Sequence, residues 1–442
     1  DAEALRGAAR LIATSSSCAC QWGLAFEQQI AALGVTEAVA DLMAITGNID
    51  NPGGNALYRC AFLIEKRYGL GDEYIDPEVY AKKLIPATSG INESNIVSCA
   101  DTDAILAAIE TGEPYPIKAM FMMQNNAIAC MGAQPQRILP ALQKMEFNVV
   151  VDLFLTPTAL ACADVLLPAA CFAERIGITG HQPYALGAIA QAVEPLGECK
   201  SDQRIIYETG SRFTDEAHKK WDDEQGFYDY LLRKTGYTYE TLRERTWAYP
   251  EFEYNKHEKG LLRRDGTVGF ATSTGRYNFY CPEMLHFGLS PLADYEEPPE
   301  SPVSAPDLAE KYPLVLTTGA RKWGFFHSEH RQSPSMRRLH PDPTVLIHPE
   351  TAAAYGIADG DWVTIENNFG SCRQKAELTT RIRKDTVSAD HAWWFPERGP
   401  EDGTLFGTLE SNINQLVPMR PGKSGLGASY KSQLCTIGKV EE

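Results

Sequence analysis

The chain lacks the cysteine clusters that define several classes of metalloprotein. No C-x-x-C pair occurs among its eleven cysteines, and only Cys18 and Cys20 lie close together. Because iron–sulfur and zinc-ribbon sites need clustered thiolates, the sequence excludes such a site within this chain. The odd count and the isolated spacing also argue against a disulfide framework. We therefore expect most of the cysteines to be small buried hydrophobic residues.

Long apolar runs and an excess of positive charge are missing too. No run approaches the roughly 18 apolar residues that cross a bilayer, so no transmembrane segment is expected. The formal net charge is −17, with 41 Lys and Arg against 58 Asp and Glu. Nucleic acid is therefore not expected as a partner, since its backbone is bound by clustered Lys and Arg. No G-x-G-x-x-G precedes a helix, which disfavours a plain dinucleotide-binding dehydrogenase.

The residues that are present fit a large folded protein. The chain has 442 residues, of which 44% are hydrophobic and 22% charged. These values are ordinary for a globular protein, and the length predicts roughly three units. The chain begins at Asp1 without a signal-like segment, so we expect a processed or truncated N-terminus. The protein is expected to be soluble, either cytoplasmic or exported in the folded state.

The most informative stretch is VVVDLFLTPTALACADVLLP, residues 149–168. Its first part predicts a buried parallel strand with Asp152 near the carboxyl end. Thr156 followed by Pro157 is typical of a helix start, because Pro lacks the N–H that would have no partner there. Ligands of open α/β sheets bind outside the carboxyl ends of strands, so we expect Asp152 and Asp164 to point at one crevice. A carboxylate there suits guanine, because its two oxygens can accept from the N–H donors of the base. The alternative is that both acids only cap or terminate elements.

The order of predicted elements is β-α-β around this stretch. PIKAMFMMQ and NVVVDLFL are expected strands, and LPALQKM between them an expected helix. Before them, a helix is predicted from Ala25 to about Thr46, and residues 57–115 are expected to be an irregular surface excursion. Residues 177–199 are predicted to be a loop, because Gly and Pro alternate there with polar residues. Residues 295–306 are a Pro-rich acidic linker, and short strands beyond it, with TAAAYG as a helix, predict a compact barrel.

Four blocks in this order resemble the molybdopterin-dependent oxidoreductases of the dimethyl sulfoxide reductase type. They are LMAITGNIDNPGGNA at 42–56, MFMMQNNAI at 120–128, the stretch 149–168, and residues 313–371 from PLVLTTG to NNFGS. The resemblance implies a Rossmann-like parallel-sheet nucleotide-binding domain followed by a C-terminal double-psi β-barrel. It also implies a molybdenum or tungsten ion on two pyranopterin guanine dinucleotides. The glycine turns taken alone are explained as well by helix ends and tight turns.

The resemblance divides the chain into ranges. Residues 1–115 would be an entry segment that completes the central domain, 116–294 an α/β dinucleotide-binding domain with an insert, and 307–442 the barrel. The family carries a [4Fe–4S] cluster on four cysteines in an N-terminal domain, and a later segment supplies the metal ligand. Neither matches a segment of this chain, so we expect the C-terminal portion of a larger catalytic subunit, inactive alone. Its partners would be that iron–sulfur domain, an electron-transfer subunit and a small-molecule substrate.

Candidate cofactor-binding residues come from two sources. Where the expected strand PIKAMFMMQ ends, side-chain amides can donate to phosphate and sugar oxygens. After residue 316, hydroxyl, backbone and guanidinium groups can hold a pyrophosphate. The alternative is that this second segment is only a solvated basic loop. These are Gln124, Asn125, Asn126, Thr317, Thr318, Gly319 and Arg321, together with Asp152, Thr156 and Asp164 above. The family resemblance adds Gln21, His327, Ser328, Arg331, His391, Asn412, Tyr430 and Lys431.

HQPYALG, WWFPE and ESNINQLVP are most similar to the branch with acetylene hydratase, pyrogallol transhydroxylase and catechol dehydroxylases. The predicted function is therefore that of a molybdenum or tungsten bis-pyranopterin oxidoreductase that acts in dehydroxylation or hydroxylation of small or aromatic substrates. A non-catalytic protein that binds or matures the guanine dinucleotide cofactor is the alternative. No catalytic residue and no protein ligand to the metal can be assigned from this chain.

Overall fold

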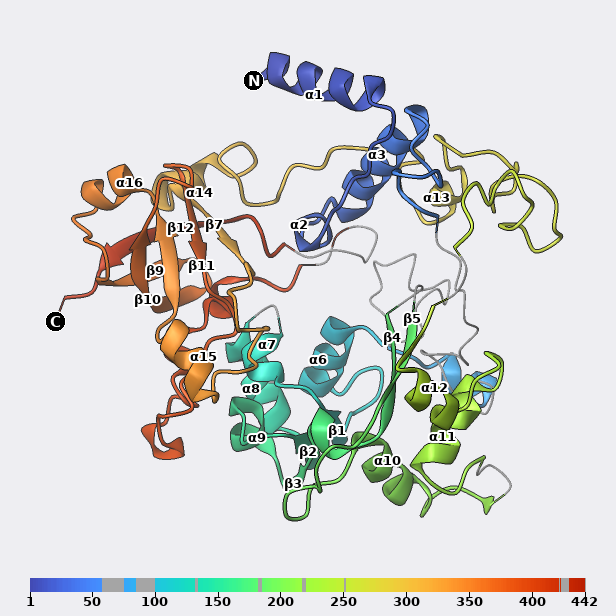
Figure 1. Cartoon of the computed structure of the whole chain (residues 1–442). Helices are drawn as coiled ribbons and strands as arrows, with labels where there is room; N and C mark the ends of the chain where they lie inside the picture. Colours follow the sequence, from blue (N-terminus) through green and yellow to red (C-terminus); the bar gives the residue numbers. More distant parts are fainter. Residues whose placement is uncertain are drawn as a thin grey trace. The chain divides into compact units, whose positions relative to one another are not determined.

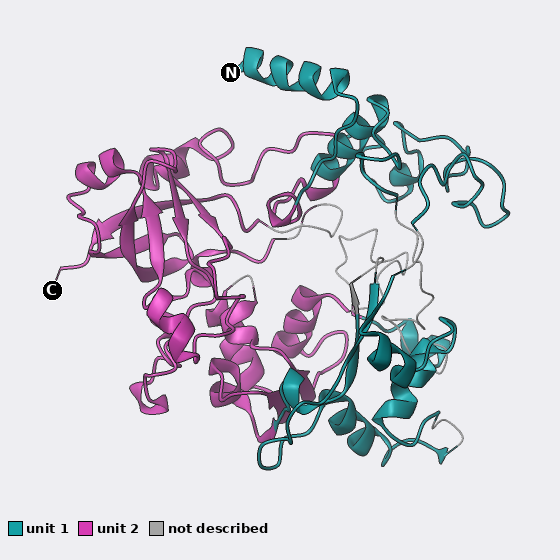
Figure 2. Ribbon diagram, viewed as in Figure 1, with its two compact units in different colours: residues 1–22, 34–83, 168–293 teal, residues 23–33, 84–167, 294–442 magenta. Residues whose placement is uncertain are grey.

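A computed structural model describes residues 1–57, 75–84, 100–131, 134–181, 185–216, 220–249, 252–420, 422 and 429–441. The chain forms two compact units, each assembled from separate segments (Figure 2). Unit 1 contains residues 1–22, 34–83 and 168–293, and unit 2 contains 23–33, 84–167 and 294–442. The ranges predicted from the sequence, 1–115, 116–294 and 307–442, are contiguous instead, and their boundaries stay a prediction.

Unit 2 holds a three-stranded sheet in the order β1-β2-β3 (Figure 1). Its strands are β1 (Ala119–Met123), β2 (Phe147–Asp152) and β3 (Val165–Pro168). β1 and β2 are parallel, as predicted, with Met120 opposite Asn148. Four helices belong to this part: α6 (Thr102–Thr111), α7 (Ala127–Cys130), α8 (Pro135–Gln143) and α9 (Pro157–Cys162). Ile128, Ile138 and Val150 are fully buried in their shared core.

Two predictions about this part have different outcomes. The helix start at Thr156 is confirmed, because its hydroxyl accepts the N–H of Ala159 and Pro157 is the first helical residue. The irregular excursion 57–115 is wrong where the structure describes it at α6, and residues 58–74 and 85–99 lie outside the described residues. Asp101 caps the start of α6, and Gly112 ends it at a φ of 80°. Leu106 and Ile109 at helical spacing enter the core, so the signals of a helix were present.

The second part of unit 2 is a closed six-stranded barrel in the order β10-β8-β11-β7-β12-β9. The strands are β7 (Leu314–Thr318), β8 (Thr344–Ile347), β9 (Trp362–Asn367), β10 (Gly370–Leu378), β11 (Thr386–Ala389) and β12 (Gln433–Lys439). The predicted compact barrel is therefore confirmed. Alternate residues of each strand point inward, as Leu314 and Leu316 of β7 do, and form one buried core.

Short helices connect and flank the barrel strands. They are α14 (Pro306–Lys311), α15 (Pro334–Leu339), α16 (Pro349–Ala354), η4 (Pro400–Asp402), α17 (Thr408–Ser411) and η5 (Ile413–Leu416). The predicted TAAAYG helix is α16.

The helix predicted from Ala25 to Thr46 is interrupted, however. It forms α2 (Leu24–Glu27) and α3 (Ala32–Ile45), because Gln28 leaves the helical region at φ −97° and ψ 42°.

Unit 1 contains an antiparallel sheet and several helices. Its elements are α1 (Ala2–Thr14), most of α3, α4 (Pro77–Tyr80), η2 (Phe172–Glu174), β4 (Gly177–His181), β5 (Ala185–Ile189), α10 (Asp202–Gly210), α11 (Glu224–Leu232), α12 (Tyr239–Arg245), β6 (Trp247–Ala248) and α13 (Glu283–His286). The prediction of a loop at 177–199 is wrong at 177–181 and 185–189, where β4 and β5 pair, and is confirmed at 190–199. Gly187 in β5 is needed since a Cβ would lie 3.0 Å from the ring of Trp247. A glycine required by packing therefore made this strand resemble a loop.

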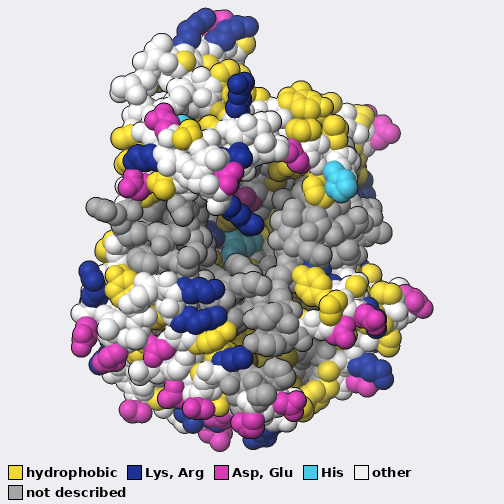
Figure 3. Space-filling model, turned by 90° about the vertical axis from the view of Figure 1, so that its right-hand side faces the viewer, with side chains coloured by type: hydrophobic (Ala, Val, Ile, Leu, Met, Phe, Trp, Pro, Cys, Tyr) yellow, Lys and Arg dark blue, Asp and Glu magenta, His cyan; other side chains and the backbone are white. Residues whose placement is uncertain are grey.

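The surface carries both signs of charge. On the face drawn in Figure 3, Lys and Arg side chains are interspersed with Asp and Glu side chains over the described residues. Among the helices of the described ranges, none is long and apolar enough to span a bilayer.

Candidate functional site

Polar side chains stand at the carboxyl ends of β1 and β2. Gln124 and Asn125 directly follow β1 and are exposed, and Gln124 has a φ of 53°. The Gln124 N–H donates to the Val151 carbonyl at 3.1 Å, which keeps this turn beside the end of β2. Asp152 ends β2 half-buried, and burial raises the pKa of its carboxyl group. The edge of the sheet thus presents two amides and one carboxylate at the place expected for a ligand.

Asp164 lies at the other end of the sheet. Its Oδ2 accepts the N–H of Asn148 at 2.7 Å, and its own N–H donates to the Asn148 carbonyl at 2.9 Å. Asn148 is four positions before Asp152 in β2, which is about 13 Å along an extended strand. The expectation that Asp152 and Asp164 face one crevice is therefore wrong. Asp164 precedes β3 instead of following a strand, so it fastens the beginning of β2.

Two predicted cofactor residues bind each other. Asn126 is 8% exposed, and its Nδ2 donates to Oγ of Ser328 at 3.1 Å. Asn126 Oδ1 accepts the hydroxyl of Thr158 at 2.9 Å. Ser328 is also buried and lies 2.9 Å from Sγ of Cys130. These contacts tie the sheet to the barrel segment 318–331, so the two side chains hold neighbours in place.

A cationic cradle lies where β7 ends, which we define as Thr318, Gly319, Tyr430 and Lys431. The Thr318 hydroxyl donates to the Tyr430 carbonyl at 3.0 Å, and Nζ of Lys431 donates to the Thr318 carbonyl. Gly319 has a φ of 80°, and a Cβ there would lie 2.8 Å from Nζ of Lys431. Partial burial lowers the pKa of Lys431. The ammonium therefore packs directly on a glycine backbone, which only glycine permits.

Two other barrel residues that were predicted to bind the cofactor, His327 and His391, form a pair. His327 Nδ1 lies 2.9 Å from His391 Nε2. Burial, and then the positive charge of Arg321, lowers the pKa of His327. Burial and the neighbouring His327 lower the pKa of His391 to about 4. Both rings are therefore neutral near pH 7, and the N–H of one donates a hydrogen bond to the bare nitrogen of the other.

Arg331 is almost completely buried against two aromatic rings. Its guanidinium carbon lies 4.1 Å from the ring centre of Phe325 and 4.5 Å from that of Trp393. It donates to the carbonyl of His327 at 2.8 Å, and burial lowers its pKa to about 10. Arg331 therefore supports the loop that carries His327. Arg321, in contrast, is exposed with its guanidinium carbon 4.3 Å from the Phe326 ring centre.

The carboxylates that hold the basic segment 317–331 were not predicted from the sequence. Nζ of Lys322 lies 3.3 Å from Glu377 and 3.8 Å from Asp390. Asp390 also accepts from Nε2 of His340 at 2.7 Å. Glu377 and Asp390 therefore supply an internal counter-charge to the basic segment 317–331. Glu377 lies in another strand and Asp390 follows one, so only barrel closure brings them to Lys322.

The side chain of Asn412 is enclosed by protein groups. The residue is fully buried, its Oδ1 accepts the N–H of Ala392 at 3.1 Å, and its Nδ2 donates to the Ala129 carbonyl at 2.9 Å. Asn412 therefore joins the barrel to α7, and its role as a cofactor contact stays a prediction. Thr317 remains half-buried in β7 opposite Ser388.

Gln21 belongs to unit 1, in an exposed loop held by the glycine-rich turn. Asn48 Oδ1 accepts the N–H of Cys18 at 2.8 Å, and Asn55 Oδ1 accepts the N–H of Cys20 at 2.7 Å. Within the same turn, Asp50 is fully buried and its Oδ1 lies 2.5 Å from Nζ of Lys256. A Cβ on Gly54 would lie 2.6 Å from the Asn48 carbonyl oxygen. The glycine therefore serves close packing, and the asparagines flanking it were the missed signal.

The exposed groups of unit 2 fit an anionic dinucleotide. Amides at the sheet edge can bind a base or sugar, while the ammonium of Lys431 and the guanidinium of Arg321 can bind phosphates. Among the described residues, no carboxylate pairs with Lys431, so its charge is available to an anion. A parallel sheet with amides at its edge, followed by a barrel that carries cations, is typical of the class of dinucleotide-binding proteins.

Comparison with known proteins gives the family. Residues 13–211 match the molybdopterin oxidoreductase model, and residues 314–434 match the molydopterin dinucleotide binding domain. Dopamine dehydroxylase of Eggerthella lenta is 29% identical over 90% of this chain and 46% of its own length. Acetylene hydratase of Syntrophotalea acetylenica is 29% identical over 91% of this chain and 57% of its own. The solved acetylene hydratase from Pelobacter acetylenicus has a TM-score of 0.84 and 26% identity, covering this whole chain and 63% of that one.

The two matched models together extend over more than two thirds of the chain. The chain therefore belongs to the molybdopterin oxidoreductases of the dimethyl sulfoxide reductase family. It spans about half the length of the curated relatives it matches.

Proposed function

We propose that this chain is the dinucleotide-binding part of the catalytic subunit of a molybdenum or tungsten enzyme that uses two pyranopterin guanine dinucleotides. The observation that carries the proposal is the cationic cradle. Lys431 donates to the backbone of Thr318, next to a glycine that leaves room for the ammonium. A phosphate bound there would gain charge-assisted hydrogen bonds of about 1.5–3 kcal/mol each.

The chain's own residues would bind and orient the cofactor. In this proposal the sheet is the Rossmann-like domain of the family and the barrel is its double-psi barrel. Gln124, Asn125 and Asp152 would contact a base or ribose, while Arg321 and Lys431 would neutralise phosphates. The neutral His327–His391 pair can hold one proton between its two facing nitrogens. The bound cofactor would supply the redox chemistry.

The reaction class is inferred from the relatives' names. Dopamine dehydroxylase and acetylene hydratase both change the oxygen content of small molecules, and one of them acts on an aromatic compound. We therefore propose hydroxylation, dehydroxylation or hydration of a small or aromatic substrate. An iron–sulfur domain in the intact protein and an electron-transfer subunit are the proposed partners. The half-length match to these relatives supports that proposal.

The test uses the protein purified from anaerobic cells with all of its natural coding sequence. Molybdenum and tungsten are measured by elemental analysis, and guanine nucleotide after acid release. We expect two guanine nucleotides per metal ion in the wild type and a lower nucleotide load in Lys431→Met. Lys384→Met, which removes an exposed barrel lysine paired with Glu350, is the control and should keep the wild-type load.

Two results would change the conclusion. A purified protein without guanine nucleotide or metal would overturn the proposed cofactor. A protein that binds the nucleotide and metal but turns over no small hydroxylated or unsaturated substrate with an artificial electron carrier would instead favour the cofactor-binding or maturation protein.

A further inference from the structure

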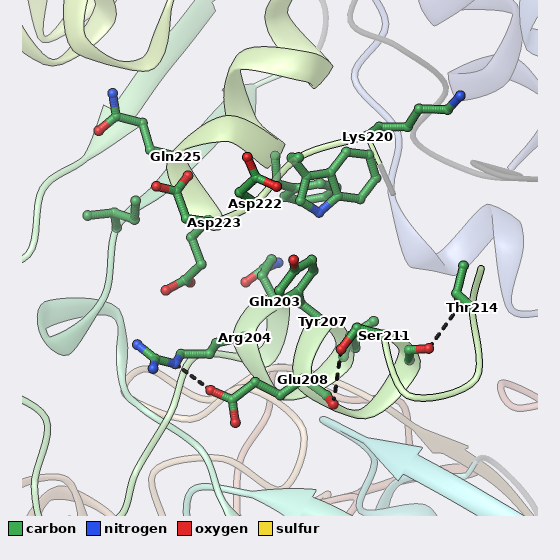
Figure 4. A pocket seen from close by; sticks show the side chains of 16 residues that line it. Gln203, Arg204, Tyr207, Glu208, Ser211, Thr214, Lys220, Asp222, Asp223 and Gln225 are labelled. Carbon is green, nitrogen blue, oxygen red and sulfur yellow. Dashed lines mark hydrogen bonds and ion pairs between the residues drawn. The ribbon is translucent and has the colours of Figure 1, made fainter. Parts of the chain in front are cut away.

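A cavity of about 660 Å³ lies in unit 1 between α10 and the beginning of α11 (Figure 4). Among the predicted cofactor residues, none lines it. Its size is within the range of about 300–1,000 Å³ that is typical of small-molecule sites. The cavity therefore needs an explanation other than the cofactor.

The walls of the cavity are largely apolar and aromatic. Tyr207 from α10 and Phe227 from α11 line it, together with Trp221 from the segment before α11. The Trp221 ring centre lies 4.9 Å from that of Phe227, so these two rings form one wall. Ile206 also lines the cavity and is 55% exposed. Apolar surface of this kind binds a flat apolar group more readily than it stays hydrated.

Carboxylates outnumber cations among the charged side chains that line the cavity: Glu208, Asp222, Asp223 and Glu224 stand against Arg204 and Lys220. Oε1 of Gln203 is buried and accepts no hydrogen bond from any described residue. Asp222 and Asp223 lie across the cavity from Gln203 in Figure 4. Within the described ranges Asp222 has no cationic partner, whereas the carboxylate of Glu208 is paired with Lys200 and Arg204. A ligand that fits these groups must bring N–H donors.

The helix end at this cavity does not attract an anion. Asp223 caps α11 by accepting the N–H of Gly226 at 2.7 Å, and Glu224 follows it in the first turn. These two carboxylates already balance the positive end of the helix dipole. With four carboxylates against two cations, the charged side chains that line the cavity sum to a negative charge.

We propose that this cavity binds a small organic cation, in which a planar aromatic ring is joined to a protonated amine. The ring would lie against Trp221 and Tyr207, where a positive charge nearby is also favoured by the aromatic faces. The ammonium would donate to Asp222 and to Oε1 of Gln203. This ligand class follows from the cavity alone and does not depend on the proposed function.

The test uses three probes that share a phenyl ring on a short chain and end in a cationic, a neutral or an anionic group. The full chain is titrated by calorimetry with 2-phenylethylamine, with the neutral 2-phenylethanol and with the anionic 3-phenylpropionate. We expect the amine to bind in a 1:1 complex about three- to fivefold more tightly than the alcohol, as one partly exposed charge pair contributes up to about 1 kcal/mol. The anion should bind most weakly. Failure of the amine to saturate the protein would overturn the proposal.

Two variants locate the binding. Asp222→Asn should weaken the amine about three- to fivefold and leave the alcohol unchanged. Glu198→Gln, at an exposed carboxylate of the same unit outside the cavity, is the matched control and should change neither. Ile206→Phe adds volume to an already exposed lining residue and should abolish binding of both without unfolding the chain. Equal amine affinity in Asp222→Asn and the wild type, or undiminished binding to Ile206→Phe, would show that the ligand is not held here.

Discussion

His327 and His391 form a direct ring-to-ring hydrogen bond, with Nδ1 of one 2.9 Å from Nε2 of the other. Neither ring is free to take up a proton easily, because Arg331 and the burial of both rings disfavour a positive charge. Two histidines that are 64 positions apart thus act as one neutral group beside the cationic cradle.

Acid should destabilise the fold through this pair. The pKa of His391 is lowered to about 4, whereas an unfolded histidine titrates near about 6.5. Between these values the unfolded state binds more protons, so stability is complete above about pH 6.5 and falls as the pH drops toward 4. The loss should reach up to about 3 kcal/mol. Urea unfolding from pH 7.5 to 4.5 measures it.

His391→Gln should make stability less dependent on pH over the same range. The control is His286→Gln, because His286 is exposed in α13 of the other unit. An unchanged pH slope in His391→Gln would mean that other groups cause the loss.

Gly319→Ala should disturb the cationic cradle, whereas an alanine at another glycine with the same backbone angle should not. Gly319 and Gly112 both have a φ of 80°, so an alanine at either position costs about 1–2 kcal/mol for its left-handed conformation. Only at Gly319 does a Cβ also meet Nζ of Lys431. We expect Gly319→Ala to lower nucleotide load in the holoenzyme and Gly112→Ala to keep it. Equal loads in the two variants would show that the cradle does not require the glycine.

Lys256→Met should loosen the loop that carries Gln21. Removing one partner of a buried ion pair leaves the Asp50 carboxylate uncompensated and costs about 3–5 kcal/mol. Hydrogen exchange of the Cys18 and Cys20 amides should accelerate, because the turn that binds them contains Asp50. Lys259→Met breaks an exposed pair with Glu253 and should leave exchange unchanged. Slow exchange of both amides in Lys256→Met would show that the turn holds the loop without the ion pair.

Asn412→Ala should reduce stability and leave nucleotide affinity intact in the folded fraction. Its amide makes buried hydrogen bonds to Ala129 and Ala392, and leaving such groups without partners costs about 1–3 kcal/mol each. Chemical unfolding and nucleotide titration separate the two effects. Asn368→Ala, at an exposed barrel turn, is the control. A weaker nucleotide affinity at normal stability would place Asn412 among the cofactor contacts.

Local signals in the sequence predicted much of the fold. The β-α-β order, the helix start at Thr156 and Pro157, and the barrel strands all depend on residues close together in the chain. Such patterns of apolar spacing and capping act over a few positions, so they can be recognised without the structure. The same is true of α6, whose capping residue Asp101 was overlooked.

Partners distant in sequence were harder to predict. Asn126 and Ser328 were both predicted to face the cofactor, but each is the hydrogen-bond partner of the other across 202 positions. A buried amide and a ligand-binding amide are the same residue type, and only packing separates them. For Lys322, the choice of Glu377 and Asp390 as counter-charges likewise depends on barrel closure.

The sequence by itself determined the family, the order of the elements and the region where a dinucleotide would bind, because these depend on residue types and spacing along the chain. The tertiary structure decided which polar groups still face outward. Asp164 fastens the start of β2 and Asn412 joins the barrel to α7, while Gln124, Asn125, Arg321 and Lys431 keep groups that a ligand can reach. The physical reason is that a buried polar group must find a partner, and the partner it finds is fixed by the closing of the sheet and barrel.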